Sequence, residues 1–332
     1  MEGKMAKITI LIAVYNAEQY LRECLDSLKQ QTFTDFQAIC VDDASTDDSL
    51  DILHSYAEQD ARFEVISLEE NVGQARARNI ALEKAVGEYT CFLDSDDWFS
   101  LDALQKAIDA FKENEELGCV LFDVVYCDEQ GQELHHYPME RFSEMKGSDA
   151  FEASLTWKIH GVYVARTSLY QRYPYDDSSR SYSDDNTTRL HYLSSLCVGC
   201  CEGIYYYRQH AQSTTHQVTV RRFDYLQANK SMKSQLMEAG VEERILDIYE
   251  NVRWLNVIDL YMFYYNHRRS LGKEGAAYGL EEIKKAWADI EVKRLTPSNR
   301  WKFGYCPLHF SWNLFRLQEE LYFALRSIKN RF

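Results

Sequence analysis

Short apolar runs alternate with amphipathic segments over the first hundred residues of this 332-residue chain. Residues 8–14 form a continuous β-branched and aliphatic run, which is typical of a strand buried on both faces. Residues 36–41, 63–67 and 89–93 are predicted to be further strands. Between these runs, apolar residues recur at helical spacing. The alternation predicts an α/β fold with a mostly parallel sheet and helices on both of its sides.

Polar residues mark where the predicted helices begin and end. We expect Asn16 to cap the first helix, and Ser45 with Asp48 to open the second as an acidic variant of the capping box. A turn over residues 71–73 leads into the third helix, which Gly87 is expected to end. Each strand therefore ends in a turn that carries polar residues.

The chain beyond about Arg222 is predicted to be helical. Apolar residues recur at helical spacing over residues 223–237, 245–261 and 283–290. A last helix carries an apolar stripe, which consists of Leu314, Leu317, Leu321, Leu325 and Ile328. We therefore expect an α/β domain over residues 1–221 and a helical region over residues 222–332.

The formal net charge of −15 argues against a general nucleic-acid binder, whose surface would be basic. The C-terminal tail has the opposite charge, because residues 293–332 contain eight Lys or Arg and only two acidic residues. A basic helix with an apolar stripe can lie on an anionic membrane surface. The helix over residues 310–332 can equally dock on the body of the protein or pair in a homodimer, and the sequence leaves all three open.

The nine cysteines do not suggest a secreted disulfide framework, because several lie in apolar runs where a free thiol packs as a small core residue. The N-terminal apolar stretch is short and has the composition of a strand, so no signal peptide is expected. No segment approaches the ~20 apolar residues of a spanning helix. The expected location is the cytoplasm, with the inner face of the membrane as the place where the basic tail would bind.

An acidic cluster, Asp94-Ser95-Asp96-Asp97, follows the apolar run at residues 89–93. Ligands of open α/β sheets bind at the carboxyl ends of the strands, and clustered carboxylates there suit a hard cation such as Mg²⁺ or Mn²⁺. The competing interpretation is an acidic turn that caps a helix starting near Leu101. Other strand ends add Tyr15, Asp42-Asp43, Arg76 and Arg78.

Each of these residues has a plausible role on a nucleoside diphosphate: a ring to stack on a base, a carboxylate to accept from a base N–H, and arginines near phosphate. Each also has an ordinary structural role, but their occurrence at successive strand ends favours a nucleotide site. The sequence contains neither G-x-G-x-x-G nor a P-loop motif, so the nucleotide must be held in another way.

These motifs resemble the inverting glycosyltransferases of family 2, which have the GT-A fold. The matching stretches are residues 10–16, 31–33, 41–47, 71–79 and 87–89 running into 92–97. The resemblance covers residues 6–125 and implies a GT-A, Rossmann-like sheet in which 6–125 form the donor half and 126–221 the acceptor half.

The resemblance also implies roles for residues at the strand ends. A nucleotide-sugar donor would place its base near Tyr15 and Asp43, its diphosphate near Arg76 and Arg78, and its ribose near Asp94 and Ser95. Asp96 is the favoured ligand of Mn²⁺ or Mg²⁺, and Asp97 is a second candidate. A family position that is often polar is Ala13 here, so a side-chain hydrogen bond to the base is missing from that site.

Two further stretches resemble catalytic parts of the family. In the family an acidic pair, commonly Glu-Asp, precedes a helix and its second member is the general base; here the pair is Asp184-Asp185, which makes Asp185 the expected base. The competing role for these acids is simple capping of the helix. Farther along, Arg208 is expected to contact the diphosphate, and His210 either ligates the cation or packs.

The resemblance implies transfer of a hexose or N-acetylhexosamine, from a donor expected to be a UDP-sugar, to a glycan or lipid-linked acceptor in surface polysaccharide synthesis. Two alternatives remain. A sugar-1-phosphate nucleotidyltransferase would carry a glycine-rich phosphate loop after its first strand, whereas this chain has Tyr15-Asn16-Ala17-Glu18 there. A non-catalytic carbohydrate-binding relative would tolerate loss of the metal and base carboxylates, yet both sets are present.

Overall fold

The computed structural model describes residues 6–179, 182, 184–210 and 218–329, and in this part of the chain two compact units form. The first unit contains the described residues up to Asp177 and those from Thr187 to His210. The second contains the described residues of 178–186 together with those from 218 onward. The grouping of 178–186 with the second unit has no counterpart in the sequence pattern, and the independence of domains 1–221 and 222–332 stays a prediction.

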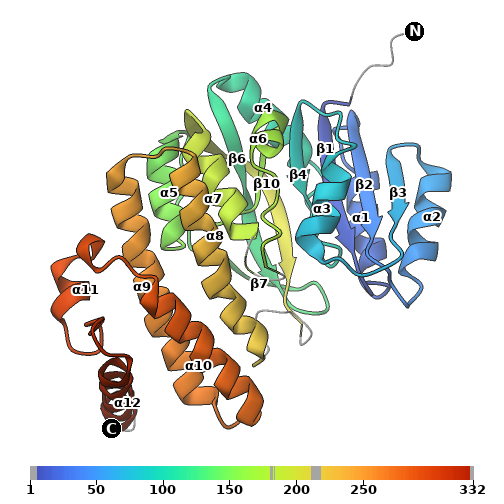
Figure 1. Cartoon of the computed structure of the whole chain (residues 1–332). Helices are drawn as coiled ribbons and strands as arrows, with labels where there is room; N and C mark the ends of the chain where they lie inside the picture. Colours follow the sequence, from blue (N-terminus) through green and yellow to red (C-terminus); the bar gives the residue numbers. More distant parts are fainter. Residues whose placement is uncertain (1–5, 180–181, 183, 211–217, 330–332) are drawn as a thin grey trace. The chain divides into compact units, whose positions relative to one another are not determined.

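A single mixed sheet forms the centre of the first unit (Figure 1). Among the described residues its main path runs in the order β3-β2-β1-β4-β9-β6-β10-β5, with β7 paired to β6 and β8 paired to β10. The strands are β1 Ile8–Val14, β2 Phe36–Asp42, β3 Phe63–Ser67, β4 Tyr89–Phe92, β5 Trp98–Phe99, β6 Leu117–Cys127, β7 Glu133–His136, β8 Met145–Lys146, β9 Tyr163–Arg166 and β10 Cys197–Arg208.

The pairing of the strands divides the sheet into two parts. Strand β1 is parallel to both β2 and β4, and β2 is parallel to β3, so the donor half is the parallel sheet that the sequence predicts. Strand β9 lies antiparallel between β4 and β6, and β6 is again parallel to β10. The ends of β1, β2, β4 and β10 therefore bring residues from distant parts of the sequence to one edge.

Helices cover both faces of this sheet and bury a separate apolar cluster on each (Figure 1). Helices α1 Leu21–Lys29, α2 Ser49–Gln59 and α4 Ala103–Glu113 pack on one face. Helices α3 Gln74–Leu82, α5 Gly147–Leu155 and α6 Thr167–Arg172 pack on the other, together with Tyr192 of α7 Asp184–Ser194. The predicted layers are confirmed.

The helix boundaries differ from those predicted. Helix α1 begins at Leu21 because Asn16 has a positive φ of 50° and its side chain accepts a 2.8 Å bond from the Thr46 backbone N–H. Helix α2 begins at Ser49, so Ser45 does not cap this helix; its hydroxyl accepts from the Asn16 N–H. Gly87 lies beyond the end of α3 and allows close approach of the strands, since a Cβ there would lie 2.6 Å from the Thr9 nitrogen.

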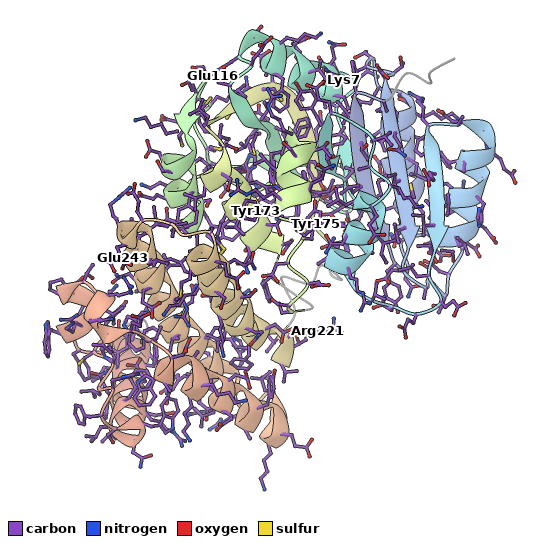
Figure 2. The ribbon with its side chains drawn as sticks, turned by 45° about the horizontal axis from the view of Figure 1, so that its top comes forward. Lys7, Glu116, Tyr173, Tyr175, Arg221 and Glu243 are labelled. Carbon is purple, nitrogen blue, oxygen red and sulfur yellow. The ribbon has the colours of Figure 1, made fainter. Side chains whose placement is uncertain are left out.

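The second unit is a helical bundle with an aromatic core. Its helices are α8 Asp224–Glu238, α9 Glu243–His267, α10 Gly272–Ala288, α11 Pro297–Trp301 and α12 Trp312–Lys329, with 3₁₀ turns at Val220–Phe223 and Val292–Arg294. Figure 2 labels Glu243, the first residue of α9. Trp254 and Trp287 donate their indole N–H groups to the Tyr305 and Pro307 carbonyls, so both rings are buried with their polar atoms bonded. Among the described helices none is long and apolar enough to cross a membrane.

The four leucines of the apolar stripe on the last helix face solvent. Phe315 and Phe323 are buried against the core of the second unit. The leucines on the other side of α12 are exposed, with fractions of 46% for Leu314, 55% for Leu317, 51% for Leu321 and 60% for Leu325. In the second unit the helix thus docks through its aromatic residues and leaves the leucine stripe open.

Candidate active site

The polar residues predicted at the strand ends come together on one edge of the sheet in the first unit. Val14, the last residue of β1, is paired with Asp42 of β2, and the Asp43 N–H donates a 2.8 Å bond to the Val14 carbonyl. On the other side of β1, Leu11 is paired with Phe92 of β4. The parallel pairing thus places the residues that follow β1, β2 and β4 beside one another.

Tyr15 and Asp43 occupy different environments at this edge. The Tyr15 ring is 51% exposed and can offer a face to a ligand, whereas the neighbouring Ala13 is half-buried. Asp43 is buried, and its two carboxylate oxygens accept from the Val72 and Gly73 N–H groups at 2.7 and 2.9 Å. Asp43 therefore fixes the turn that begins α3, and any contact with a base would use its remaining lone pairs.

Asp42, which the sequence places at the same strand end as Asp43, is also a buried acceptor. One oxygen accepts a 3.2 Å bond from the Ser45 N–H, and the other, Oδ1, is buried without a hydrogen-bond partner among the described residues. A buried carboxylate oxygen left without a donor is costly, so Asp42 has unused capacity at the same edge. Its place in the Asp42-Asp43 pair was the only signal in the sequence.

The two arginines of α3 differ in position. Arg76 is exposed, as a phosphate-contacting side chain would be. Arg78 is buried and forms a salt bridge with Asp94, while its guanidinium lies over the rings of Phe92 at 4.3 Å and Tyr175 at 5.2 Å. Figure 2 labels Tyr175. Arg78 thus holds Asp94 in this structure, where the sequence analysis expected it near the donor diphosphate.

The three carboxylates of the acidic cluster have three different surroundings. Asp94 pairs with Arg78 and also accepts a 2.9 Å bond from the Gln74 side chain. Asp96 is partly exposed, and its Oδ2 lies 2.8 Å from Nε2 of His210. The turn is closed by the Asp97 N–H, which donates to the Asp94 carbonyl at 3.1 Å, and Ser95 lies within it half-buried.

Asp97 is enclosed beneath the end of β10. Its Oδ1 accepts a 2.7 Å bond from the Arg208 backbone N–H, and the residue is almost completely buried. Burial, followed by the Asp96 and Asp94 carboxylates, raises the pKa of Asp97 well above its usual value. Asp97 is the second metal-ligand candidate of the sequence; in this structure its carboxylate supports the turn, whereas those of Asp94 and Asp96 are partly exposed.

Arg208 supports the acidic turn through hydrogen bonds that involve the backbone. Its Nε donates to the Asp96 carbonyl at 3.0 Å, Nη1 donates to the Glu129 carbonyl at 2.8 Å, and Nη2 forms a salt bridge with Glu23. The guanidinium lies between the rings of Tyr20 and Trp98, 4.9 and 4.5 Å from their centroids.

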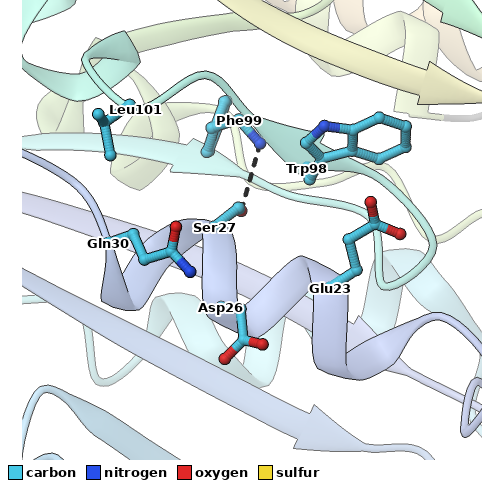
Figure 3. A pocket seen from close by; sticks show the side chains of 7 residues that line it. All are labelled: Glu23, Asp26, Ser27, Gln30, Trp98, Phe99 and Leu101. Carbon is cyan, nitrogen blue, oxygen red and sulfur yellow. Dashed lines mark hydrogen bonds between the residues drawn. The ribbon is translucent and has the colours of Figure 1, made fainter. Parts of the chain in front are cut away.

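Glu23 and Trp98 also line a pocket of about 410 Å³ beside α1 and β5 (Figure 3). Arg208 is buried, and each of its guanidinium nitrogens donates a bond within the protein, while its contact with a diphosphate stays a prediction. In this structure it positions the acidic turn through its bond to the Asp96 carbonyl.

Asp96 and His210 suit a divalent cation. A metal with bonds of about 2.1 Å and near-octahedral geometry separates adjacent ligands by about 3 Å, which is close to the 2.8 Å between Asp96 Oδ2 and His210 Nε2. Carboxylate and imidazole are both ligands that Mn²⁺ accepts. No cluster of three or more such side chains occurs in the described part of the chain, so the other positions would fall to water and phosphate oxygens.

Asp184 and Asp185 form the first turn of α7 and are both half-buried. Acids in a first turn are favoured by the helix dipole, so their position agrees with capping as well as with catalysis. The next residue, Asn186, donates a 2.8 Å bond to the Ala228 carbonyl and anchors the start of α7 within the second unit. The assignment of Asp185 as the base stays a prediction.

Residues 9–178, just over half of the chain, match the family model described as glycosyl transferase family 2. The chain is 28% identical to EpsH of Bacillus subtilis over 227 residues, which are 65% of each protein. It is 26% identical over 247 residues to TarS of Staphylococcus aureus, a poly(ribitol-phosphate) beta-N-acetylglucosaminyltransferase, which covers 72% of this chain and 42% of TarS. The chain thus spans less than two thirds of these relatives.

A solved structure has the same fold over nearly the whole chain. The crystal structure of residues 1–349 of S. aureus TarS in complex with UDP-GlcNAc superposes with a TM-score of 0.74, covers 96% of this chain and 92% of that one, and shares 21% identity. The predicted GT-A fold with C-terminal helices is therefore confirmed.

Proposed function

The chain belongs to glycosyl transferase family 2, and from this we propose that it transfers a hexose or N-acetylhexosamine from a UDP-sugar to a hydroxyl of a glycan or lipid-linked acceptor in surface polysaccharide synthesis. The observation that carries the proposal is the approach of Asp96 to His210, at 2.8 Å, on the edge that also presents Tyr15. The UDP-GlcNAc in the TarS crystal and the poly(ribitol-phosphate) acceptor in the name of TarS support the donor and acceptor classes.

The donor would lie across the ends of β1, β2 and β4. The exposed Tyr15 ring would stack on the base, and Asp43, held by the turn at Val72 and Gly73, would accept from the base edge. Exposed Arg76 would approach the phosphates. Asp94 and Ser95 would face the ribose, with Arg78 fixing the Asp94 carboxylate.

Asp96 and His210 would hold Mn²⁺ or Mg²⁺. The bound cation supplies a Lewis acid that neutralises charge on the departing diphosphate. Arg208 and Asp97 maintain the turn that presents Asp96, through the bonds to the Asp96 carbonyl and to the Arg208 N–H. Such support matters because misplacement of a ligand by a fraction of an ångström weakens a site.

Asp185 would act as the general base. The acceptor hydroxyl loses a proton as its oxygen attacks the anomeric carbon from the face opposite the leaving diphosphate, which inverts the configuration. Asp185 would take that proton. Asp184, beside it in the first turn of α7, stands where the family commonly has Glu and would adjust the local charge.

Release of UDP from a panel of UDP-hexoses and UDP-N-acetylhexosamines, with and without Mn²⁺, tests the proposal on the full chain. Turnover of one donor with Mn²⁺, together with transfer to a polyol or glycan acceptor, is the expected result. Formation of pyrophosphate from UTP and a sugar 1-phosphate would instead identify a nucleotidyltransferase. Donor binding without any turnover would identify a non-catalytic relative.

We propose that the enzyme works in a reducing compartment, the cytoplasm, at the inner face of the membrane. All nine cysteines lie within the described residues and are unpaired, eight of them in the first unit and Cys306 in the second. The exposed leucines of α12 lie in the basic tail, where Arg316 and Arg326 add positive charge. An apolar face with basic neighbours is suited to an anionic lipid surface, at which a lipid-linked acceptor would be met.

A further inference from the structure

A second cavity of the first unit lies along β6 and β7, in the half of the sheet where the acceptor is expected. Its volume is about 240 Å³, large enough for several water molecules or a small ligand group. The residues that line it are Asp123, Val124, His136, Tyr137, Met139, Arg141 and His160.

His160 contributes a buried polar atom that lacks a well-aligned partner. The residue is 5% exposed, and its Nδ1 accepts a 3.2 Å bond from the Val162 backbone N–H. Because a backbone N–H can only donate, the proton of the neutral ring must lie on Nε2. Nε2 is buried and forms no hydrogen bond of normal geometry among the described residues, although the Phe122 backbone lies near enough to favour the protonated ring.

The His160 ring is held firmly in this position. Its backbone carbonyl accepts a 2.7 Å bond from the Tyr192 hydroxyl, and its ring packs edge-on against Tyr137 at 5.0 Å. Burial lowers the pKa of His160 to about 4 and outweighs the opposing effect of the Asp123 carboxylate, so the ring is neutral near pH 7. A buried donor that lacks a well-aligned acceptor is unfavourable, and a ligand oxygen in the cavity would supply that acceptor.

Asp123 and Arg141 supply acceptors and donors of opposite charge. Nε of Arg141 donates to Oδ1 of Asp123 at 2.9 Å, and Nη2 pairs with the other carboxylate oxygen. A third nitrogen, Nη1, lies 3.5 Å from Glu202. The paired charges leave lone pairs on Asp123 and N–H groups on Arg141 that can meet hydroxyls, while Asp123 and Glu202 would repel an added anion.

From these contacts we propose that the cavity is a subsite for a neutral, hydroxyl-bearing unit of the acceptor, a sugar ring or a polyol. That the ligand is the acceptor rests on the proposed function. That the ligand is neutral and carries hydroxyls rests on the cavity alone. His160 donates from Nε2 to one ligand oxygen, and Asp123 accepts from a ligand hydroxyl. Val124, Met139 and the Tyr137 ring supply apolar surface for the carbon skeleton.

The neighbouring loop supports this location. The Tyr137 hydroxyl donates to the Trp157 carbonyl, which fixes the segment that leads to His160. Trp157 has a positive φ of 57° and a half-exposed ring, with the Arg189 guanidinium 5.9 Å away. A half-exposed indole ring near a polar cavity is a surface on which a further sugar ring can stack.

Saturation-transfer NMR, which measures the binding of three probes to the full chain, tests the proposal. The probes are methyl β-D-glucopyranoside, ribitol and inorganic phosphate. We expect one of the first two to bind, and the arm that responds tells a sugar ring from a polyol. His160→Phe removes the donor but keeps a planar ring. Met139→Trp fills the cavity and removes no polar group from its lining. Each should weaken probe binding by about tenfold or more, which corresponds to the loss of one buried hydrogen bond or of the space itself.

The controls separate this inference from the proposed function. UDP affinity should stay within about twofold in both variants, and His54→Phe, on the exposed side of α2, should leave probe binding unchanged. If His160→Phe fails to fold, Met139→Trp and Asp123→Asn carry the test. Binding of phosphate alone, binding of neither polyhydroxyl probe, or full binding in Met139→Trp overturns the subsite. Absence of UDP release by the wild-type protein would count against the proposed function and not against the subsite.

Discussion

The Nε of Arg208 donates a 3.0 Å hydrogen bond to the backbone carbonyl of Asp96, which ties the end of β10 to the acidic turn after β4. The two residues are 112 positions apart in the sequence. The same arginine is held by Glu23 from α1 and lies between two aromatic rings. The orientation of the candidate metal ligand is thus set by a residue that need not touch the metal.

Arg208→Lys should therefore weaken metal binding without removing a ligand. Lysine keeps the charge but cannot donate to the Asp96 and Glu129 carbonyls and to Glu23 at once. Loss of a supporting residue around a metal typically costs about 10- to 100-fold in affinity. Titration of Mn²⁺ in the presence of UDP, followed by electron paramagnetic resonance, measures this. Arg62→Lys, at the opposite edge strand, is the matched control, and an unchanged Mn²⁺ affinity in Arg208→Lys would refute the positioning role.

Asp96→Asn should abolish metal-dependent donor binding. The amide removes the negative charge that a divalent cation requires, while the shape of the side chain is retained. UDP-sugar affinity measured by calorimetry should no longer respond to Mn²⁺, although a weak metal-independent component remains. Asp97→Asn is the comparison, because its carboxylate is buried under Arg208 and its replacement should act on stability first. Equal Mn²⁺ dependence in wild type and Asp96→Asn would sink the metal assignment.

Asp185→Asn should keep donor binding and lose transfer. An amide cannot take the proton of the acceptor hydroxyl, and loss of a general base lowers kcat by about 10²- to 10⁴-fold. UDP-sugar affinity and the rate of transfer are measured separately to divide binding from chemistry. Asp184→Asn, one residue earlier in the same helical turn, should have a smaller effect on kcat. Equal losses in the two variants would favour helix capping over catalysis.

Glu319 should make stability depend on pH. Burial raises its pKa to about 8 from 4.5, because the residue is enclosed in the second unit and only Gln318 donates to it in the described structure. Between these values the folded state holds a proton that the unfolded chain has released, so the free energy of unfolding falls as pH rises, by at most about 1.4 kcal/mol per pH unit.

Denaturant unfolding at pH 5, 6, 7 and 8 should show this slope in the wild type and a flatter one in Glu319→Gln. The neutral amide does not titrate, so stability at pH 8 should rise relative to wild type. Glu113→Gln on the exposed side of α4 serves as the control. Parallel slopes for wild type and Glu319→Gln would show that Glu319 ionises without cost.

The double variant Leu317→Glu and Leu321→Glu should lose binding to vesicles of phosphatidylglycerol and phosphatidylcholine. Both leucines are about half exposed on α12, so carboxylates there remove apolar contact and repel the anionic surface. Co-sedimentation measures binding, and added salt should weaken it in the wild type. Leu134→Glu, an exposed leucine of β7, is the control. A wild type that does not bind vesicles but changes its oligomeric state in the double variant would point to a homodimer.

Much of the donor half could be predicted from local pattern. The runs at residues 8–14 and 63–67 become β1 and β3 with the predicted bounds, and β1 is buried along almost its whole length, as its continuous apolar sequence predicts. Helix starts were predicted less well. Asn16 and Ser45 have the residue types of caps, yet they bond to each other's loops, a long-range contact that no local pattern contains.

The sequence by itself determined the order of strands and helices in the donor half, the polar residues at their ends and the resemblance to a family. Only the tertiary structure decided which of these residues reach solvent. Arginine is a residue type that often binds phosphate, but both Arg78 and Arg208 are buried. Arg78 packs against Tyr175, and Arg208 packs against Tyr20 and Trp98. Side-chain burial depends on neighbours brought from far along the chain, and the same reason hid the buried ring nitrogen of His160 and the outward turn of the leucine stripe on α12.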